Sequence, residues 1–283
     1  MNLPPTFQFS QTNLRDYETC ERRFQLRYLL RQSWPAVESE PLAQYEDLME
    51  RGQRFHQLAQ QHQMGLREQV LSKTIDDPDL RRWWRNYLES PPPDLPVAVR
   101  RAEVVLSTPV GGPADGRPLR RLSARYDLLA LEPGRRAVVV DWKTSRRRPD
   151  SAFLQSHLQT RVYRYVLVQA GTVLNGGVPL TPEQVTMIHW FAEYPTEPEI
   201  LLYDQAQYLD DAAYLSELVA RIVDHAARDQ DEWPLTPDER HCRFCIYRSL
   251  CERGVSAGRL EDFDADQALD FSFSFQEVEE IAY

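Results

Sequence analysis

The order of apolar and polar positions divides the chain into helical segments near both ends and a run of strands between them. Apolar residues recur at helical spacing in several windows, for example at Leu48, Phe55 and Leu58. In the middle of the chain the pattern changes to alternating and β-branched positions, which are typical of strands. We therefore expect helices over residues 11–31, 45–63, 79–89, 152–170 and 205–229, and strands over residues 97–108, 120–131, 136–142 and 185–191.

Glycine and proline mark the breaks between these segments. Prolines 91–93 end the third helix, a Gly/Pro-rich loop over 111–118 separates the first two strands, and Pro133-Gly134 separates the second strand from the third. Helices, a strand meander, a helix and a further strand predict a mixed central sheet flanked by helices. The expected fold class is therefore α/β.

The net charge of −10 is unevenly distributed along the chain. Residues 261–283 hold eight acids and no base, which predicts a flexible acidic tail after a single domain over residues 1–260. Residues 117–148 carry ten arginines and lysines against three acids. Such a basic strip can hold a phosphate backbone, and the alternative is that its arginines only solvate a strand face.

The sequence gives no sign of secretion or membrane insertion. Its first residues lack the basic and apolar stretches of a secretory signal, and no window approaches the roughly 18 apolar residues of a membrane span. We therefore expect a cytoplasmic protein without a membrane partner, in which thiols stay reduced.

Two aspartates and a lysine lie at the ends of neighbouring predicted strands. Asp141 and Lys143 are two residues apart, so both project from one face of their strand, and Asp127 ends a similar stretch in the strand before. Carboxylates can hold Mg²⁺ or Mn²⁺, which lowers the pKa of an attacking water, and a lysine can offset charge on a phosphoryl group. This grouping suits phosphodiester hydrolysis, although Asp-x-Lys alone is more typical of a surface ion pair.

Three further residues strengthen that hypothesis by their order in the chain. His56 lies on a predicted helix, and an imidazole is a plausible further ligand for Mn²⁺. Gln159 and Tyr163 are one helical turn apart, so they share a face of the helix that follows the Asp-x-Lys strand. Taken singly, each is equally compatible with a core or surface position.

The four cysteines suggest one thiolate site. Cys20 stands near the start of the chain, and Cys242, Cys245 and Cys251 form a Cys-x2-Cys-x5-Cys run near its end. Four thiolates suit a [4Fe–4S] cluster or a structural Zn²⁺ ion, and either would join the two ends of the chain. The alternative is that Cys20 is an unrelated buried thiol.

Taken together and in this order, the motifs resemble the PD-(D/E)XK nuclease superfamily. The series is Gly52-x-x-x-His56, Asp127 in a strand, Val140-Asp-x-Lys-Thr, Gln159-x-x-x-Tyr163 and the split cysteine set. More narrowly it is similar to the RecB-like iron–sulfur branch, which includes the AddB nuclease domain and the CRISPR-associated RecB-like exonucleases. Departures are Ser-Ala-Arg at 123–125 where a glycine is usual, Tyr126 in place of proline, and Asp141 in place of glutamate.

The resemblance implies a restriction-endonuclease-like core and a role for each motif residue. His56, Asp127, Asp141 and the Trp142 carbonyl would ligate Mg²⁺ or Mn²⁺, and Asp127, Asp141 and Lys143 would be catalytic. Gln159 and Tyr163 would bind substrate, together with Arg125 and Arg146 from the basic strip. The cysteines would hold a [4Fe–4S] cluster rather than zinc.

The expected function is a metal-dependent deoxyribonuclease, acting as an exonuclease on DNA ends or single strands in DNA repair, recombination or CRISPR adaptation. One alternative is a DNA-binding subunit, stabilised by its cluster, of a helicase or CRISPR adaptation complex. The chain has no nucleotide-binding glycine loop, so any motor would be another polypeptide. A second alternative is a nuclease that acts on RNA.

The turn at Pro133-Gly134 decides how the two aspartates face each other. A two-residue turn would pair position 127 with position 140, and Asp127 would then leave the opposite face from Asp141. Proline also cannot adopt the positive φ that both central positions of a type I′ turn require. We therefore expect a three-residue connection over 133–135, or a bulge, that sets Asp127 opposite Asp141.

Overall fold

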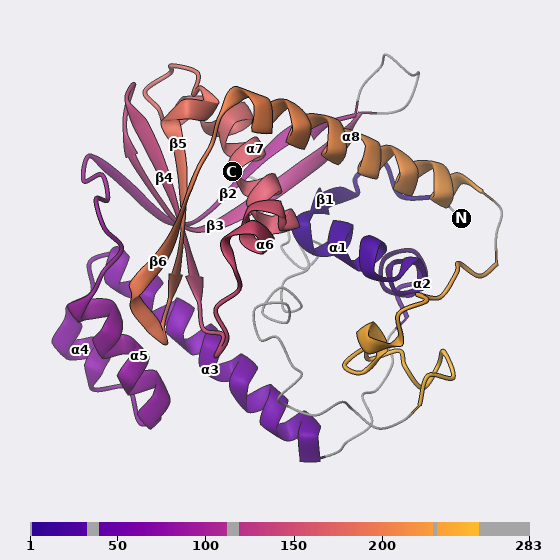
Figure 1. Cartoon of the computed structure of the whole chain (residues 1–283), viewed down its shortest axis with the longest axis horizontal. Coiled ribbons are helices and arrows are strands. Elements are labelled where there is room, and N and C mark those ends of the chain that lie inside the picture. The colour runs from indigo at the N-terminus through magenta and orange to yellow at the C-terminus, as the bar shows by residue number, and fades with distance from the viewer. Residues whose placement is uncertain (1, 33–39, 112–118, 229–230, 255–283) are drawn as a thin grey trace.

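The structure is a computed structural model that describes residues 2–32, 40–111, 119–228 and 231–254. The predicted acidic tail, 261–283, lies outside the described residues. Figure 1 shows a central sheet with helices on both sides, so the expected α/β architecture is confirmed.

In the described part of the chain the sheet has six strands, in the order β1-β3-β4-β5-β6 with β2 paired to the other edge of β3. It is mixed, because β1–β3 and β4–β5 are parallel while β2–β3, β3–β4 and β5–β6 are antiparallel. The strands are β1 (Gln8–Ser10), β2 (Val99–Val110), β3 (Arg120–Glu132), β4 (Arg136–Lys143), β5 (Val185–Phe191) and β6 (Tyr194–Leu202).

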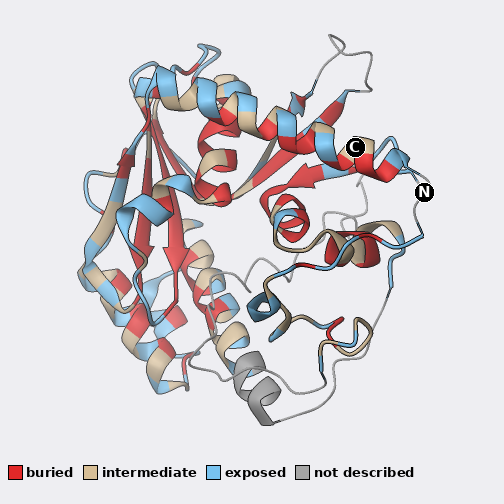
Figure 2. Cartoon of the chain, turned by 45° about the vertical axis from the view of Figure 1, so that its right-hand side comes forward, coloured by how far each residue is buried: buried red, intermediate tan, exposed pale blue. Residues whose placement is uncertain are grey.

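The helices cover the two faces of the sheet and bury a separate core on each. Val139 and Val140 are neighbours in β4, and they point to opposite cores because side chains alternate along a strand. The central strands β3, β4 and β5 are largely buried, whereas the helices turn exposed residues outward (Figure 2). The helices are α1 (Gln11–Thr19), α2 (Glu21–Phe24), α3 (Glu40–Gln63), α4 (Glu68–Ser72), α5 (Pro78–Glu89), α6 (Ser151–Ser156), α7 (Leu158–Ala170) and α8 (Gln205–Ala227).

The first core packs beneath α1, α7 and α8, and the second packs beneath α3 and α5. Leu14 of α1, Val162 of α7 and Leu218 of α8 belong to the first core. Phe55 of α3 and Trp83 of α5 belong to the second. The two helical layers therefore approach the sheet from opposite sides, and a site at the sheet's edge can draw residues from both.

Two helices expected as continuous are interrupted. The helix predicted over 11–31 breaks at Cys20, whose backbone is extended at φ −162° and ψ 110°, and then ends in a π-helical segment, Gln25–Leu29. The helix predicted over 152–170 breaks at His157, where ψ is 137°. Both breaks involve a residue whose backbone leaves the helical region without a proline or glycine to signal it.

The hairpin between β3 and β4 has the predicted three-residue connection. Glu132 pairs with Arg136 and Leu128 pairs with Val140, which is the predicted register, and the pairing ends there, one position before Asp127 and Asp141. The Arg135 amide donates to the Glu132 carbonyl at 2.9 Å, and Gly134 has φ +77°. Proline followed by a positive-φ glycine is what a type II turn requires, and this turn fixes the register of the hairpin.

Along β2 and β3, the alternation of side chains between the two faces of the sheet is interrupted at a single cross-strand pair. Tyr126 and Leu129 of β3 pack in the same core although they are three residues apart, whereas Leu128 packs in the other. On β2 the residue opposite Asp127 is Glu103, which has φ +54°. Glu103 and Asp127 therefore mark the position at which the alternate side chains of both strands switch from one core to the other.

Candidate active site

A cleft forms where β1 and β4 leave a gap along the same edge of β3. β1 pairs with residues 121–123 and β4 with residues 128–132, so residues 124–127 have no strand partner on that side. β1 runs parallel to β3 and β4 runs antiparallel, so the C-terminal ends of both strands point into the gap. The strand topology thus places Ser10 and Lys143 at the two sides of one opening.

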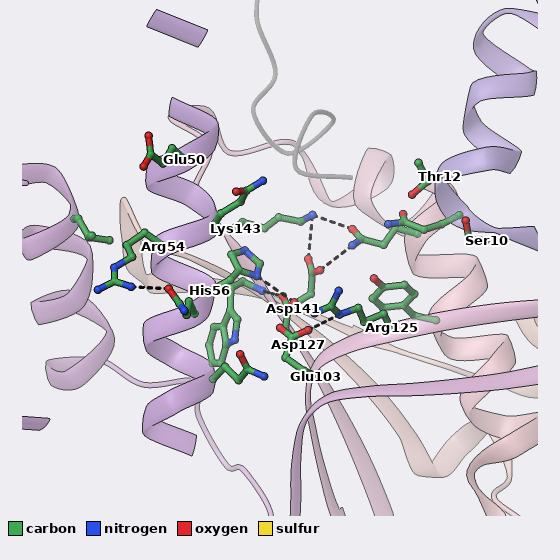
Figure 3. Close-up of a pocket in the computed structure, with 18 of the residues that line it drawn as sticks. Ser10, Thr12, Glu50, Arg54, His56, Glu103, Arg125, Asp127, Asp141 and Lys143 are labelled. Atoms are coloured by element: carbon green, nitrogen blue, oxygen red, sulfur yellow. Dashed lines mark hydrogen bonds and ion pairs between the residues drawn. The ribbon is translucent and has the colours of Figure 1, made fainter. Parts of the chain in front are cut away.

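The cleft measures about 830 Å³ and is lined by residues from several helices and strands. The start of α1 contributes Ser10 and Thr12, α3 contributes His56, and the strands contribute Asp127 and Asp141. Figure 3 shows these side chains converging from the two helical layers onto the strand ends. All the residues predicted to be catalytic or to bind the divalent metal therefore line this cleft, although they lie far apart in the sequence.

Asp127 faces α3. Its Oδ1 lies 3.1 Å from Nδ1 of His56, and its Oδ2 accepts a hydrogen bond of 2.8 Å from the Trp142 amide. Burial alone would lower the pKa of His56, but the charge of Asp127 outweighs it and raises that pKa to about 9. In the absence of a metal ion, His56 is therefore a cation paired with Asp127 at neutral pH.

Asp141 faces α7 and is 3% exposed. Its Oδ2 lies 3.0 Å from Nζ of Lys143, and its Oδ1 accepts a hydrogen bond of 2.9 Å from Nε2 of Gln159. The Oε1 of Gln159 in turn accepts a hydrogen bond of 2.8 Å from Nζ of Lys143. One amide thus bridges the aspartate and the lysine and holds both in a fixed orientation.

The charge state of Asp141 follows from these partners. Burial works against ionisation, but the Lys143 charge and a hydrogen bond from His189 together hold the pKa of Asp141 below its usual value. Asp141 is therefore an ionised carboxylate paired with an ammonium group, inside the protein rather than on its surface. This excludes the surface ion pair as the explanation for the Asp-x-Lys motif.

His189 is a site residue that the sequence did not reveal. It is fully buried on β5, next to Asp141 in the parallel register, and its Nδ1 lies 2.9 Å from Oδ2 of Asp141. Its Nε2 lies 3.1 Å from the Thr160 hydroxyl. Burial lowers the pKa of His189, so the ring is neutral, with Nδ1–H donating to Asp141 and Nε2 accepting from Thr160.

Glu103 is a second residue that the sequence analysis missed. It lies on β2 opposite Asp127, and its Oε2 lies 2.5 Å from Nε of Arg125. The only sign of this residue in the sequence was an acidic side chain within a predicted strand of mixed composition. Its meaning depended on the pairing of β2 with β3, which periodicity does not give.

A divalent cation fits one part of the cleft. His56, Glu103 and Asp127 each offer a ligand atom, and these atoms lie within 4.8 Å of one another. One imidazole nitrogen and two carboxylate oxygens form a donor set that suits Mn²⁺ or Mg²⁺. Among the described residues Asp141 is not part of this tight group, so the predicted ligands His56, Asp127 and Asp141 are only partly gathered.

The predicted substrate-binding residues divide into two groups. Gln159, Tyr163 and Arg125 line the cleft. Arg146 does not line it, and its carbonyl accepts a hydrogen bond of 3.0 Å from the Tyr194 hydroxyl. Several other arginines of the basic strip pair with carboxylates, for example Arg148 with Glu199, so part of the strip serves the fold.

The N- and C-terminal segments that carry the cysteines are packed together. The Arg22 amide donates to the Pro234 carbonyl at 3.1 Å, and the Trp233 amide donates to Oε1 of Gln25 at 2.9 Å. Tyr17 and His225 add a side-chain hydrogen bond of 3.1 Å between α1 and α8. The fold therefore brings both ends of the cysteine set to one region.

The four thiols are neighbours but do not form a tight group. Burial raises the pKa of the thiols of Cys242, Cys245 and Cys251, and the nearby Cys20 raises each further. Within the described chain, no three of the four sulfur atoms lie within 4.8 Å of one another. In a tetrahedral zinc site the sulfurs lie about 3.8 Å apart.

The fold and the cleft define a hydrolytic enzyme with paired acids and a lysine at strand ends, and the comparison with known families agrees. The model of the PD-(D/E)XK nuclease superfamily matches residues 8–252. The chain belongs to this superfamily and is a nuclease. No curated protein matches the sequence.

Two solved structures are similar in outline. SSO0001 is 11% identical, with a TM-score of 0.40, and the match covers 87% of this chain and 86% of that one. A protein from Eubacterium rectale assigned as an exonuclease is 12% identical, with a TM-score of 0.47 and 90% coverage of both chains. Both likenesses are too distant to carry an argument about this chain.

Proposed function

We propose that this nuclease is a Mg²⁺- or Mn²⁺-dependent deoxyribonuclease that removes nucleotides from DNA ends or single strands. The observation that carries the proposal is that two aspartates with different partners line the same cleft. Asp127 is grouped with His56 as a candidate metal site, and Asp141 is paired with Lys143. This arrangement supports a mechanism in which a bound cation and the buried ammonium group of Lys143 both lie beside the scissile phosphate.

The roles of the side chains follow from their contacts. A bound cation would lower the pKa of a ligated water and neutralise charge on the phosphate. Lys143 is held by Asp141 and Gln159, so its ammonium group is aimed before substrate arrives and can donate to a phosphoryl oxygen. Gln159 fixes Asp141 and Lys143 relative to each other, and Tyr163 adds a phenol to the same wall.

Cleavage assays on the full chain test the substrate and the mode of attack. Purified protein with Mn²⁺ is incubated with end-labelled and internally labelled DNA and RNA, single- and double-stranded, linear and circular, with Asp141→Asn as the control. We expect linear DNA to be degraded from its ends while circular DNA and RNA stay intact. Cutting of RNA alone, nicking of circles, or DNA binding without any cleavage would each overturn the proposal.

We further propose that Cys20, Cys242, Cys245 and Cys251 hold a [4Fe–4S] cluster, with structural Zn²⁺ as the alternative. The contact between the chain's two ends supports a shared site, and the resemblance to the iron–sulfur branch favours the cluster over zinc. Protein purified without oxygen should be brown and contain iron, and Cys20→Ser should lose both. Stoichiometric zinc without iron would decide for the alternative.

The biological setting is proposed from the motif resemblance. DNA repair, recombination and CRISPR adaptation are the candidate pathways, and a helicase or the CRISPR adaptation proteins are the candidate partners in a cytoplasmic setting. Across the described residues no helix is long and apolar enough to cross a membrane. Co-purification of the tagged full chain from its own cells, followed by identification of the bound proteins, tests the partners.

A further inference from the structure

Glu103 occupies an unusual position in β2. The pairs Ala102–Leu128 and Val104–Tyr126 flank it, so it stands directly across from Asp127. Its φ of +54° is a conformation that residues with a side chain rarely adopt inside a strand. Val99 before it and Val104 after it pack against the same core, so the strand's alternation changes phase at this residue.

This phase change places Glu103 and Asp127 between the two helical layers. Asp127 reaches His56 on α3, while the neighbouring Asp141 reaches Gln159 on α7. A regular β2–β3 ladder would keep the strand's faces constant through this point. The irregular backbone at Glu103 therefore belongs to the geometry that lets the site use residues from both layers.

The charges around Glu103 call for a cation. Glu103 is only 14% exposed on its side chain, and it lies opposite another carboxylate. The guanidinium of Arg125 contacts Oε2 of Glu103 at 2.5 Å.

The spacing of the three side chains matches what a cation would need. Ligand atoms of His56, Glu103 and Asp127 lie within 4.8 Å of one another. Oxygens on opposite sides of Mg²⁺ lie about 4.2 Å apart. In addition, Nε2 of His56 is buried without a hydrogen-bond partner among the described residues. Small side-chain movements would therefore let one cation contact all three side chains.

We propose that Glu103 is a direct ligand of the divalent cation, together with His56 and Asp127. The role of Arg125 is then to hold Glu103 in position rather than to bind DNA. This inference rests on the proposed metal-dependent function and adds a ligand from β2 to it. It also explains the irregular backbone of β2, because this irregularity brings a third side chain to the metal site.

The test measures Mn²⁺ binding directly by isothermal titration calorimetry on the full chain in the absence of DNA. Glu103→Gln keeps the shape of the side chain, and Glu103→Gly removes it while accepting the positive φ. Glu50→Gln is the matched control, because Glu50 is an exposed carboxylate of the same cleft outside the three-residue group. Asp127→Asn is the control for the proposed function, and circular dichroism in EDTA checks that each variant is folded.

We expect both Glu103 variants to bind Mn²⁺ at least about tenfold more weakly than wild type, since even outer-shell partners of a metal cost that much. Glu50→Gln should match wild type. If Asp127→Asn loses Mn²⁺ binding but Glu103→Gln behaves like Glu50→Gln, the role of Glu103 is refuted while the proposed function stands. If wild type binds no Mn²⁺, the proposed function itself fails.

Discussion

Asp141 and His189 are cross-strand neighbours on β4 and β5, and Nδ1 of His189 lies 2.9 Å from Oδ2 of Asp141. His189 has no exposed surface, and its second nitrogen contacts the Thr160 hydroxyl of α7 at 3.1 Å. The aspartate is thus oriented from behind by a neutral imidazole whose own tautomer is fixed by a helix. Buried supports of this kind hold a reactive group in place before substrate binds.

Replacing His189 should therefore damage catalysis through the orientation of Asp141. We expect His189→Leu to lower kcat by about 10- to 100-fold with little change in KM, as for other outer-shell partners. His189→Asn keeps a donor close to the position of Nδ1 and should recover part of the loss. Steady-state kinetics on labelled DNA measures both. Equal loss in the two variants would show that His189 acts only by filling space.

The pair formed by Asp141 and Lys143 should be strongly coupled in stability. The Lys143 side chain is 9% exposed, so Asp141→Ala would leave a buried ammonium group without its counter-charge. We expect that variant to lose about 3–5 kcal/mol of unfolding free energy. Adding Lys143→Met should restore part of it, and urea denaturation in EDTA gives the coupling. Additive losses would contradict a buried pair. Asp141→Asn is accordingly the gentler variant for activity assays.

His157, at the break between α6 and α7, should make stability depend on pH. Burial, followed by the charges of Lys143 and Arg15, lowers the pKa of His157 from 6.5 to about 3. Between these values the unfolded chain takes up a proton that the folded protein refuses, so folding stability falls as the pH drops below 6.5.

The size of this effect can be isolated with one variant. We expect wild type to lose about 1.4 kcal/mol per pH unit from this residue within that window. The His157→Gln variant has no titrating side chain at this position, so the difference in unfolding free energy between the two proteins should change with pH below 6.5 and stay constant above it. Denaturation curves recorded between about pH 4 and about pH 8 measure this difference in unfolding free energy. Parallel curves would mean that His157 is protonated in the folded state.

Gly134 should be needed for the turn that aligns the two aspartates. Its φ of +77° disfavours any residue with a Cβ, although no atom lies within 4 Å of where a Cβ would stand. We expect Gly134→Ala to cost about 1 kcal/mol of stability, and Gly134→Asn to cost less because asparagine tolerates positive φ. Pro133→Ala in the same turn is the control. Thermal unfolding of the three variants measures the order, and an equal effect for alanine and asparagine would argue against backbone strain.

The parts of the fold that could be predicted are those with a local signature. β5 was expected over 185–191 and forms there, because its apolar run is interrupted only by Thr186 and His189. β6 was missed because Pro195 and Pro198 are unusual in strands, and an edge strand with one partner tolerates them. Segment type follows from the local pattern, while edge strands depend on what lies beside them.

The candidate site shows the same division. His56, Asp127, Asp141 and Lys143 could be found because their order and spacing form a motif series. His189 and Glu103 could not, because each becomes meaningful only through a neighbour on another strand. A histidine within an apolar strand and an acid within an irregular one carry no periodic signal. Pairing between strands, rather than the pattern within one, determines the rest of the site.

Trp142, between the two residues of the Asp-x-Lys motif, gives the protein a built-in optical probe. Its ring lies 5.7 Å from that of Trp190 and 5.4 Å from that of Tyr87, and Trp83 and Trp84 complete the same buried layer. Four of the chain's six tryptophans are thus gathered directly behind the strand end that carries the reactive groups. Tryptophan emission and near-ultraviolet dichroism therefore report chiefly on this layer, so rearrangements at the cleft can be followed without a label.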